Sequence, residues 1–137
     1  TIDYGPCAFM DTYHPNTVFS SIDQGGRYAY ANQGRIAVWN LARFAETLLP
    51  LFSDDDDQAL AQANESLQKF SGLFADAWFS GLRRKLGLSD AQPEDEKLAQ
   101  DLLNAMAANS ADFTLTFRRL CDAAADTDAD RAVRDLF

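Results

Sequence analysis

The sequence is poor in the residues that build metal, disulfide and nucleophilic sites. It has 2 cysteines, Cys7 and Cys121, and 1 histidine, His14. These do not supply the four ligands in paired spacing that a structural zinc site needs. A Cys7–His14 nucleophilic pair would lack an orienting third group. Two distant cysteines make no disulfide framework, and the sequence leaves open whether they pair, so a reducing cytoplasm is the compartment we expect.

Long hydrophobic runs and an excess of positive charge are also missing. No apolar stretch approaches the roughly 20 residues that a membrane-spanning helix requires. The 137 residues carry 21 acidic and 12 basic side chains, for a formal net charge of -9. A surface of that sign repels phosphate backbones and anionic lipid, so we expect neither nucleic acid nor membrane as a partner. The basic clusters Arg83–Lys85 and Arg118–Arg119 are each expected near a helix end, where a cation faces the negative pole of the helix dipole.

What the sequence does contain divides into two parts, residues 1–35 and residues 36–137. The first part has no helical periodicity and is broken by turn signals at Gly5-Pro6, His14-Pro15-Asn16 and Gln24-Gly25-Gly26. Loops of this length are uncommon in compact domains and more often carry function than not. The sequence therefore predicts a long functional loop ahead of the second part.

The second part is predicted to be helical throughout. Asn32, Ser53 and Ser110 are expected to cap helix starts, and Gly87 to end the longest helix. Apolar residues recur at three- and four-residue steps, which is typical of helices that bury one face. The positions expected to face inward are Val38, Leu41, Ala45, Leu48 and Phe52, then Leu60, Leu67, Phe70, Phe74, Ala77 and Gly81, then Leu98, Leu102 and Met106, then Phe113, Phe117, Leu120 and Ala124, and finally Val133, Leu136 and Phe137. This pattern predicts an all-α helical bundle.

Two acidic stretches have the spacing of a calcium-binding loop without its geometry. In the stretch that begins at Asp54, Ala59 stands where the sharp turn needs a glycine. In the stretch that begins at Asp126, Arg131 stands at that position. Carboxylates also stabilise the positive pole at a helix start. Both stretches are therefore predicted to begin helices.

Several short motifs stand in order along the chain. They are Thr1-Ile2-Asp3-Tyr4-Gly5-Pro6, Phe9-Met10-Asp11, Gln24-Gly25-Gly26-Arg27-Tyr28, Trp39-Asn40-Leu41-Ala42-Arg43, Lys85-Leu86-Gly87-Leu88, Ala111-Asp112-Phe113-Thr114 and Phe117-Arg118-Arg119-Leu120. As a set, they resemble the selenoprotein O family over nearly the whole chain. The family often has a Cys shortly after the proline-containing turn, where this chain has Val18-Phe19-Ser20-Ser21.

That resemblance implies a fold and an activity. Members of the family are pseudokinases that transfer AMP from ATP to Ser, Thr or Tyr hydroxyls of proteins. By this correspondence Asp3, in Asp3-Tyr4-Gly5, stands where a kinase has the Asp of Asp-Phe-Gly, and would bind Mg²⁺ (or Mn²⁺) bridging the ATP phosphates. Residues 4 to about 35 would be an activation-segment-like loop, and the helices part of a kinase-like C-lobe.

The resemblance also implies what these residues lack. The catalytic base, the second metal ligand and the nucleotide-binding Lys lie upstream in the family, so no catalytic base is assigned here. We expect the 137 residues alone to be inactive and to self-associate through exposed apolar surface. An alternative is a helical protein-interaction module without retained catalysis. For Arg27, pairing with a carboxylate or phosphate and a structural salt bridge or cation–π contact with Tyr28 or Tyr30 both stay open.

Overall fold

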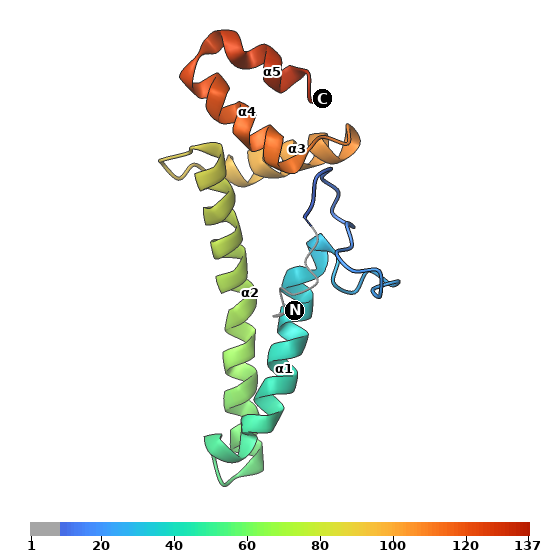
Figure 1. The fold of residues 1–137 in the computed structure, drawn as a ribbon. Coiled ribbons are helices and arrows are strands. Elements are labelled where there is room, and N and C mark those ends of the chain that lie inside the picture. Colours follow the sequence, from blue (N-terminus) through green and yellow to red (C-terminus); the bar gives the residue numbers. More distant parts are fainter. Residues whose placement is uncertain (1–8) are drawn as a thin grey trace.

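A loop leads into a long helical hairpin. The computed structural model describes residues 9–137. After the loop, a short 3-10 helix, η1 (Tyr30–Asn32), runs directly into α1 (Gln33–Phe52). The chain then reverses, and α2 (Asp56–Leu86) packs back along α1 (Figure 1).

The remaining helices gather at the C-terminal end of α2. They are α3 (Asp95–Ala108), α4 (Phe113–Ala125), a single 3-10 turn η2 (Thr127–Ala129) and α5 (Asp130–Arg134). Figure 1 shows α3 crossing the end of α2, with the N-terminal loop beside it. Between residues 9 and 137 there is no strand, only an isolated antiparallel bridge between Thr12 and Asp112. The all-α prediction is confirmed, and the place of these helices in a kinase-like C-lobe stays a prediction.

The start and end of α2 follow from its sequence. The Asp55 side chain accepts a hydrogen bond from the Gln58 backbone N–H at 2.9 Å and caps the helix, with Asp56 and Asp57 in the first turn. At the other end, Gly87 adopts a left-handed φ of 72°, which a residue without a side chain does at little cost. The acidic stretch is therefore a helix start, and Gly87 a helix end, as predicted. Ser53 as the cap is wrong, because Asp55 takes that role.

Two other caps differ from the prediction. Asn32 occupies the cap position of α1, but its side chain donates to the Gly26 carbonyl at 2.8 Å. Ser110 does not cap α4; it has a φ of 55° in the bend that follows α3. The cap is Asp112, whose carboxylate accepts from the Leu115 N–H at 2.7 Å. In both places several nearby polar residues could cap the helix start, and the backbone geometry of the preceding loop determines whether one of them does.

The core lies where the loop meets the ends of α2, α3 and α4. Its buried members are Tyr13, Leu82, Ala99, Leu103, Met106, Ala111 and Phe117. Leu60 and Leu98, both predicted to face inward, are 51% and 52% exposed. In the part of α2 that packs along α1, the buried positions are Ala59 and Ala63, because small side chains allow α1 to approach closely.

The two basic clusters have different surroundings. Arg83–Lys85 occupy the last turn of α2, as predicted. Arg83 donates to the largely buried Asp95 carboxylate at 2.7 Å, which ties α2 to the start of α3. The placement of Arg118–Arg119 near a helix end is wrong. They lie in the middle of α4, within 3.7 Å and 3.4 Å of Asp122.

We predict that Met106→Ala destabilises the protein far more than Leu98→Ala, although both residues lie on α3. Met106 is fully buried, so truncation leaves a cavity and should lower the free energy of unfolding by about 2–5 kcal/mol. Leu98 is half exposed, and its truncation should cost less than about 1 kcal/mol. Urea unfolding followed by circular dichroism measures both. An equal decrease in the free energy of unfolding in the two variants would contradict the assignment of Met106, and not Leu98, to the core.

Candidate functional site

The predicted metal ligand, Asp3, lies outside the described residues, as does Cys7. Within residues 9–137, no three His, Cys, Asp or Glu side chains come together as a possible metal site. Cys121 is exposed and not bridged. The chemistry that can be described therefore lies in the loop and at the start of α1.

The loop is anchored to α4 through Tyr13. The Tyr13 N–H donates to the Ala111 carbonyl at 2.9 Å, and the Phe113 N–H donates to the Asp11 carbonyl at 2.7 Å. The buried Tyr13 ring lies 5.6 Å from the Tyr30 ring and 5.7 Å from the Phe113 ring. Backbone pairing and aromatic packing together fix the first half of the loop on the helices.

The second half of the loop returns to the first. The Tyr30 N–H donates to the Thr17 carbonyl at 3.0 Å, and the Ala31 N–H donates to the Pro15 carbonyl at 2.8 Å. The Tyr30 ring also packs edge-on against Trp78 of α2 at 5.6 Å. Both ends of the loop are therefore held, and α1 begins in a fixed orientation.

A tight turn presents Arg27. The Asp23 carboxylate accepts the backbone N–H groups of Arg27 and Tyr28, both at 2.8 Å. Gly26 has a left-handed φ of 64°, a conformation that favours glycine. The Asn32 side chain secures the Gly26 carbonyl, so the turn is tied to the helix it precedes.

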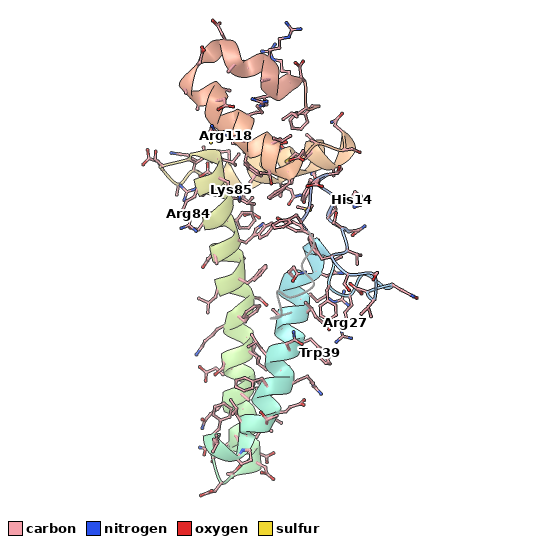
Figure 2. The ribbon with its side chains drawn as sticks, in the orientation of Figure 1. His14, Arg27, Trp39, Arg84, Lys85 and Arg118 are labelled. Carbon is pink, nitrogen blue, oxygen red and sulfur yellow. The ribbon has the colours of Figure 1, made fainter. Side chains whose placement is uncertain are left out.

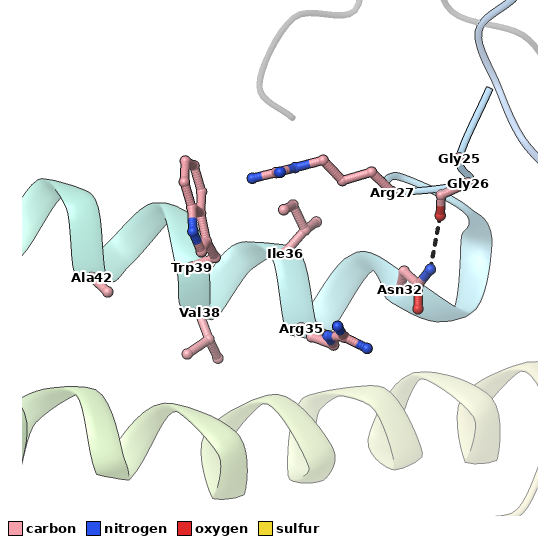
Figure 3. Close-up of a pocket in the computed structure, with 9 residues that line it drawn as sticks. All are labelled: Gly25, Gly26, Arg27, Asn32, Arg35, Ile36, Val38, Trp39 and Ala42. Atoms are coloured by element: carbon pink, nitrogen blue, oxygen red, sulfur yellow. Dashed lines mark hydrogen bonds between the residues drawn. The ribbon is translucent and has the colours of Figure 1, made fainter. Parts of the chain in front are cut away.

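An open pocket of about 670 Å³ lies between this turn and α1 (Figure 3). The Arg27 guanidinium carbon is 4.4 Å from the centre of the Trp39 ring and 5.8 Å from that of Tyr28. The cation–π interpretation of Arg27 is thus confirmed for Tyr28, and Trp39 is the closer partner. The pocket is lined by Gly25, Gly26, Arg27, Asn32, Arg35, Ile36, Val38, Trp39 and Ala42.

Sequence reasoning did not assign Arg35 and Trp39 to a site. The available signal was their four-residue spacing, which places two residues on one helical face. Figure 2 shows Arg27 and Trp39 together near the start of α1, away from Arg84, Lys85 and Arg118. His14 does not join them, since its Nδ1 accepts the Asn16 N–H at 3.1 Å within its own turn. Arg27 and Arg35 line the same pocket, and two guanidinium groups are suited to binding an anion.

The two anchoring tyrosines are held in a form that resists ionisation. Burial, with a smaller contribution from neighbouring Tyr13, raises the pKa of Tyr30 to about 12. Burial likewise raises the pKa of Tyr13. Their hydroxyls therefore stay neutral well into the alkaline range, and the aromatic anchor is not charged at neutral pH.

Comparison with known proteins gives a family match over nearly the whole chain. The family described as "Protein adenylyltransferase SelO" matches residues 1–135. The chain is 60% identical over 137 residues to the "Protein nucleotidyltransferase YdiU" of Nitrobacter hamburgensis and 64% identical over 137 residues to that of a Bradyrhizobium strain. A YdiU protein of Methylorubrum extorquens is 57% identical. The alignments include all of this chain but cover only 27%, 28% and 29% of these relatives.

We predict that the free energy of unfolding declines as pH rises from about 10 toward about 12, the ordinary and the raised pKa of Tyr30. The folded-state pKa lies above the unfolded one, so this stabilisation is complete below the unfolded pKa and is lost as pH rises through the folded pKa. Tyr30→Phe keeps the ring but removes the ionising group and should flatten the decline. Urea unfolding at a series of alkaline pH values measures the slope. An unchanged slope in Tyr30→Phe would show that Tyr30 does not carry the effect.

Proposed function

Because this chain belongs to the protein adenylyltransferase SelO family, we propose that the full-length protein transfers AMP from ATP to Ser, Thr or Tyr hydroxyls of other proteins. The family match from residue 1 to residue 135 is the observation that carries this proposal. Relatives named protein nucleotidyltransferase, at 57–64% identity, support it.

The chain spans little more than a quarter of the length of those relatives. Transfer of a nucleotidyl group needs metal, phosphates and acceptor to be positioned by several elements at once. In our proposal the catalytic base and the nucleotide-binding residues belong to the rest of the full-length protein. The 137 residues alone would then be inactive.

Asp3 is the residue of this chain to which we assign direct chemistry. An aspartate oxygen suits Mg²⁺ or Mn²⁺, both of which prefer oxygen ligands. When bound, such an ion neutralises the phosphates of ATP and orients them for transfer. The kinase-like fold and the pseudokinase description belong to the same proposal.

The described residues would serve as the support of that site. Tyr13 is ten residues beyond Asp3 in the sequence and is buried against α4. The anchored loop thus links the metal-binding motif to a fixed helical base. None of the helices in the described part is long and apolar enough to cross a membrane. With few cysteines in the chain, we infer a cytoplasmic enzyme acting on ATP and protein substrates.

We predict that Asp3→Ala abolishes transfer of AMP in the full-length protein. Loss of a metal ligand should lower labelling about a hundredfold or more, since even groups that only orient ligands are worth about ten- to a hundredfold. The measurement is Mg²⁺-dependent transfer of label from the α-phosphate of ATP to protein. Asp54→Ala, which removes an exposed carboxylate before α2, is the matched control and should label normally.

Equal labelling by Asp3→Ala and the unmodified protein would eliminate the metal role. No labelling by either protein would favour the interaction module without catalysis. Calorimetry of ATP with the 137-residue chain tests the division of the site. Tight binding there would contradict the assignment of the nucleotide site to the rest of the protein.

We also propose that the 137-residue chain by itself pairs with a second copy along the α1–α2 hairpin. An apolar groove of about 230 Å³ lies between these helices. Phe44 and Leu73 line it and are 59% and 67% exposed. Burying these exposed apolar side chains against another copy is favourable.

We predict that the double variant Phe44→Ser/Leu73→Ser shifts the isolated chain toward monomer. Size-exclusion chromatography with light scattering measures the molar mass as concentration rises. Leu60→Ser, equally polar but outside the groove, is the control and should associate like the unmodified chain. A monomer at every concentration for the unmodified chain would remove the proposal.

A further inference from the structure

Two arginines contact one exposed tryptophan on α1, and a third arginine lies one helical turn away. The Arg27 and Arg43 guanidinium carbons lie 4.4 Å and 5.8 Å from the centre of the Trp39 ring. Arg35 lies one helical turn before Trp39 and lines the same pocket as Arg27. Figure 3 shows Arg27 extending along α1 toward Trp39, while Arg35 lies on the opposite side of α1, facing α2. We call Arg27, Arg35, Trp39 and Arg43 the arginine–tryptophan surface.

The arginine–tryptophan surface is positively charged, whereas the chain as a whole is negatively charged. The sequence has 21 acidic and 12 basic residues, yet none of the described residues that line the pocket of Arg27 and Arg35 is acidic. Asp23, close to Arg27 in sequence, directs both its oxygens to backbone N–H groups. Arg43 forms an exposed ion pair with Glu46. No ion pair in the part of the chain that the structure describes includes Arg27 or Arg35.

The position of Arg27 is set before any ligand arrives. Its backbone N–H is held by Asp23, and its guanidinium lies over Trp39. Stacking uses the flat face of a guanidinium and leaves the N–H groups at its edge free to donate. A side chain that is already ordered loses less entropy when it binds. Arg27 is therefore well placed to receive a carboxylate or phosphate in a bidentate contact.

The spacing of the arginines favours an extended ligand. Arg35 and Arg43 are eight residues apart on one helix, which corresponds to about 12 Å. One phosphate group does not reach both. An extended peptide advances about 3.3 Å per residue, so carboxylates on alternate residues lie about 7 Å apart. Two carboxylates four residues apart lie about 13 Å apart, close to the separation of Arg35 and Arg43.

A nucleotide fits this surface less well than a peptide does. Its base would need a free aromatic face, and the Trp39 ring already contacts Arg27 and Arg43. From charge, spacing and this contact, we propose that the arginine–tryptophan surface binds an extended acidic segment of a partner protein. This deepens the proposed function and rests on it in one respect: the partner is taken to be a substrate of AMP transfer.

The test is direct binding to the full-length protein without ATP, so it does not depend on transfer activity. The probe is a fluorescein-labelled peptide of about eight residues with Glu at alternate positions, matched to the spacing above. A second peptide has Gln in place of each Glu. Fluorescence anisotropy should show binding of the Glu peptide only, and the affinity should fall as ionic strength rises from about 0.05 to about 0.3 M.

Substitutions locate the binding. Each of Arg27→Gln, Arg35→Gln and Arg43→Gln should weaken binding about two- to fivefold, the range for exposed ion pairs. The triple variant should lose it. The control is the triple variant Arg118→Gln/Arg131→Gln/Arg134→Gln, which changes the net charge equally on α4 and α5 and should bind normally.

Trp39→Ala should weaken binding of the Glu peptide although it removes no charge, because the Arg27 guanidinium loses the ring against which it packs. Trp39→Phe should restore most of the affinity, since a ring remains beneath the guanidinium. Circular dichroism of each variant checks that it is folded.

Several results would overturn the inference. Equal affinity of the two triple variants would place the peptide elsewhere. Equal binding of the Glu and Gln peptides would remove the role of charge. If ATP or pyrophosphate displaces the labelled peptide at a lower concentration than the unlabelled Glu peptide does, the surface binds a nucleotide and not a peptide. If the unmodified protein transfers AMP normally but does not bind the Glu peptide, the peptide-binding inference is wrong and the proposed function stands. The loss of labelling in Asp3→Ala tests the proposed function separately.

Discussion

The structure depends on the packing of Tyr13 between the loop and the helices. Its ring meets Tyr30 from the end of the loop and Phe113 from the start of α4, and Tyr30 in turn meets Trp78 of α2. Elements far apart in sequence thus share one aromatic cluster. Together with the backbone hydrogen bonds to Ala111 and Phe113, this packing holds the loop against the helices, since the apolar residues of the loop follow no periodic pattern. The direction in which α1 leaves the loop follows from this contact.

The same anchor explains why a surface of one charge can exist on a chain of the other. The loop brings Arg27 over Trp39, and the helix period places Arg43 one turn beyond Trp39, where it contacts the same ring. Arg35, one turn before Trp39, lines the same pocket as Arg27. Asp23 and Glu46 lie near this surface, and most of the other acidic groups lie at the start of α2, along α3 and near the C-terminus. Charge is therefore separated by the fold, and an overall value of -9 does not describe the surface that a partner meets.

Much of the fold was predictable because helices are local. The end of α2 at Gly87 and its acidic first turn follow from interactions within a few residues. The errors concern which side of a helix is covered. Leu60 and Leu98 have the apolar character and spacing of core positions, but no neighbouring element packs over them, and smaller alanines take the close contacts. Whether a side chain is buried depends on which elements pack against it, and the periodicity of the sequence does not give that information.

The sequence by itself determined the helical class and, through its short motifs, the family. The division into residues 1–35 and 36–137 stays a prediction. Asp3 also comes from the motif alone, and its role remains a proposal. Only the tertiary structure decided that Arg27 lies on Trp39 and not chiefly on Tyr28, and that Arg35 joins the same pocket. The physical reason is distance along the chain. Arg27 and Trp39 are separated by a turn and the start of a helix, so their contact depends on how the loop is anchored.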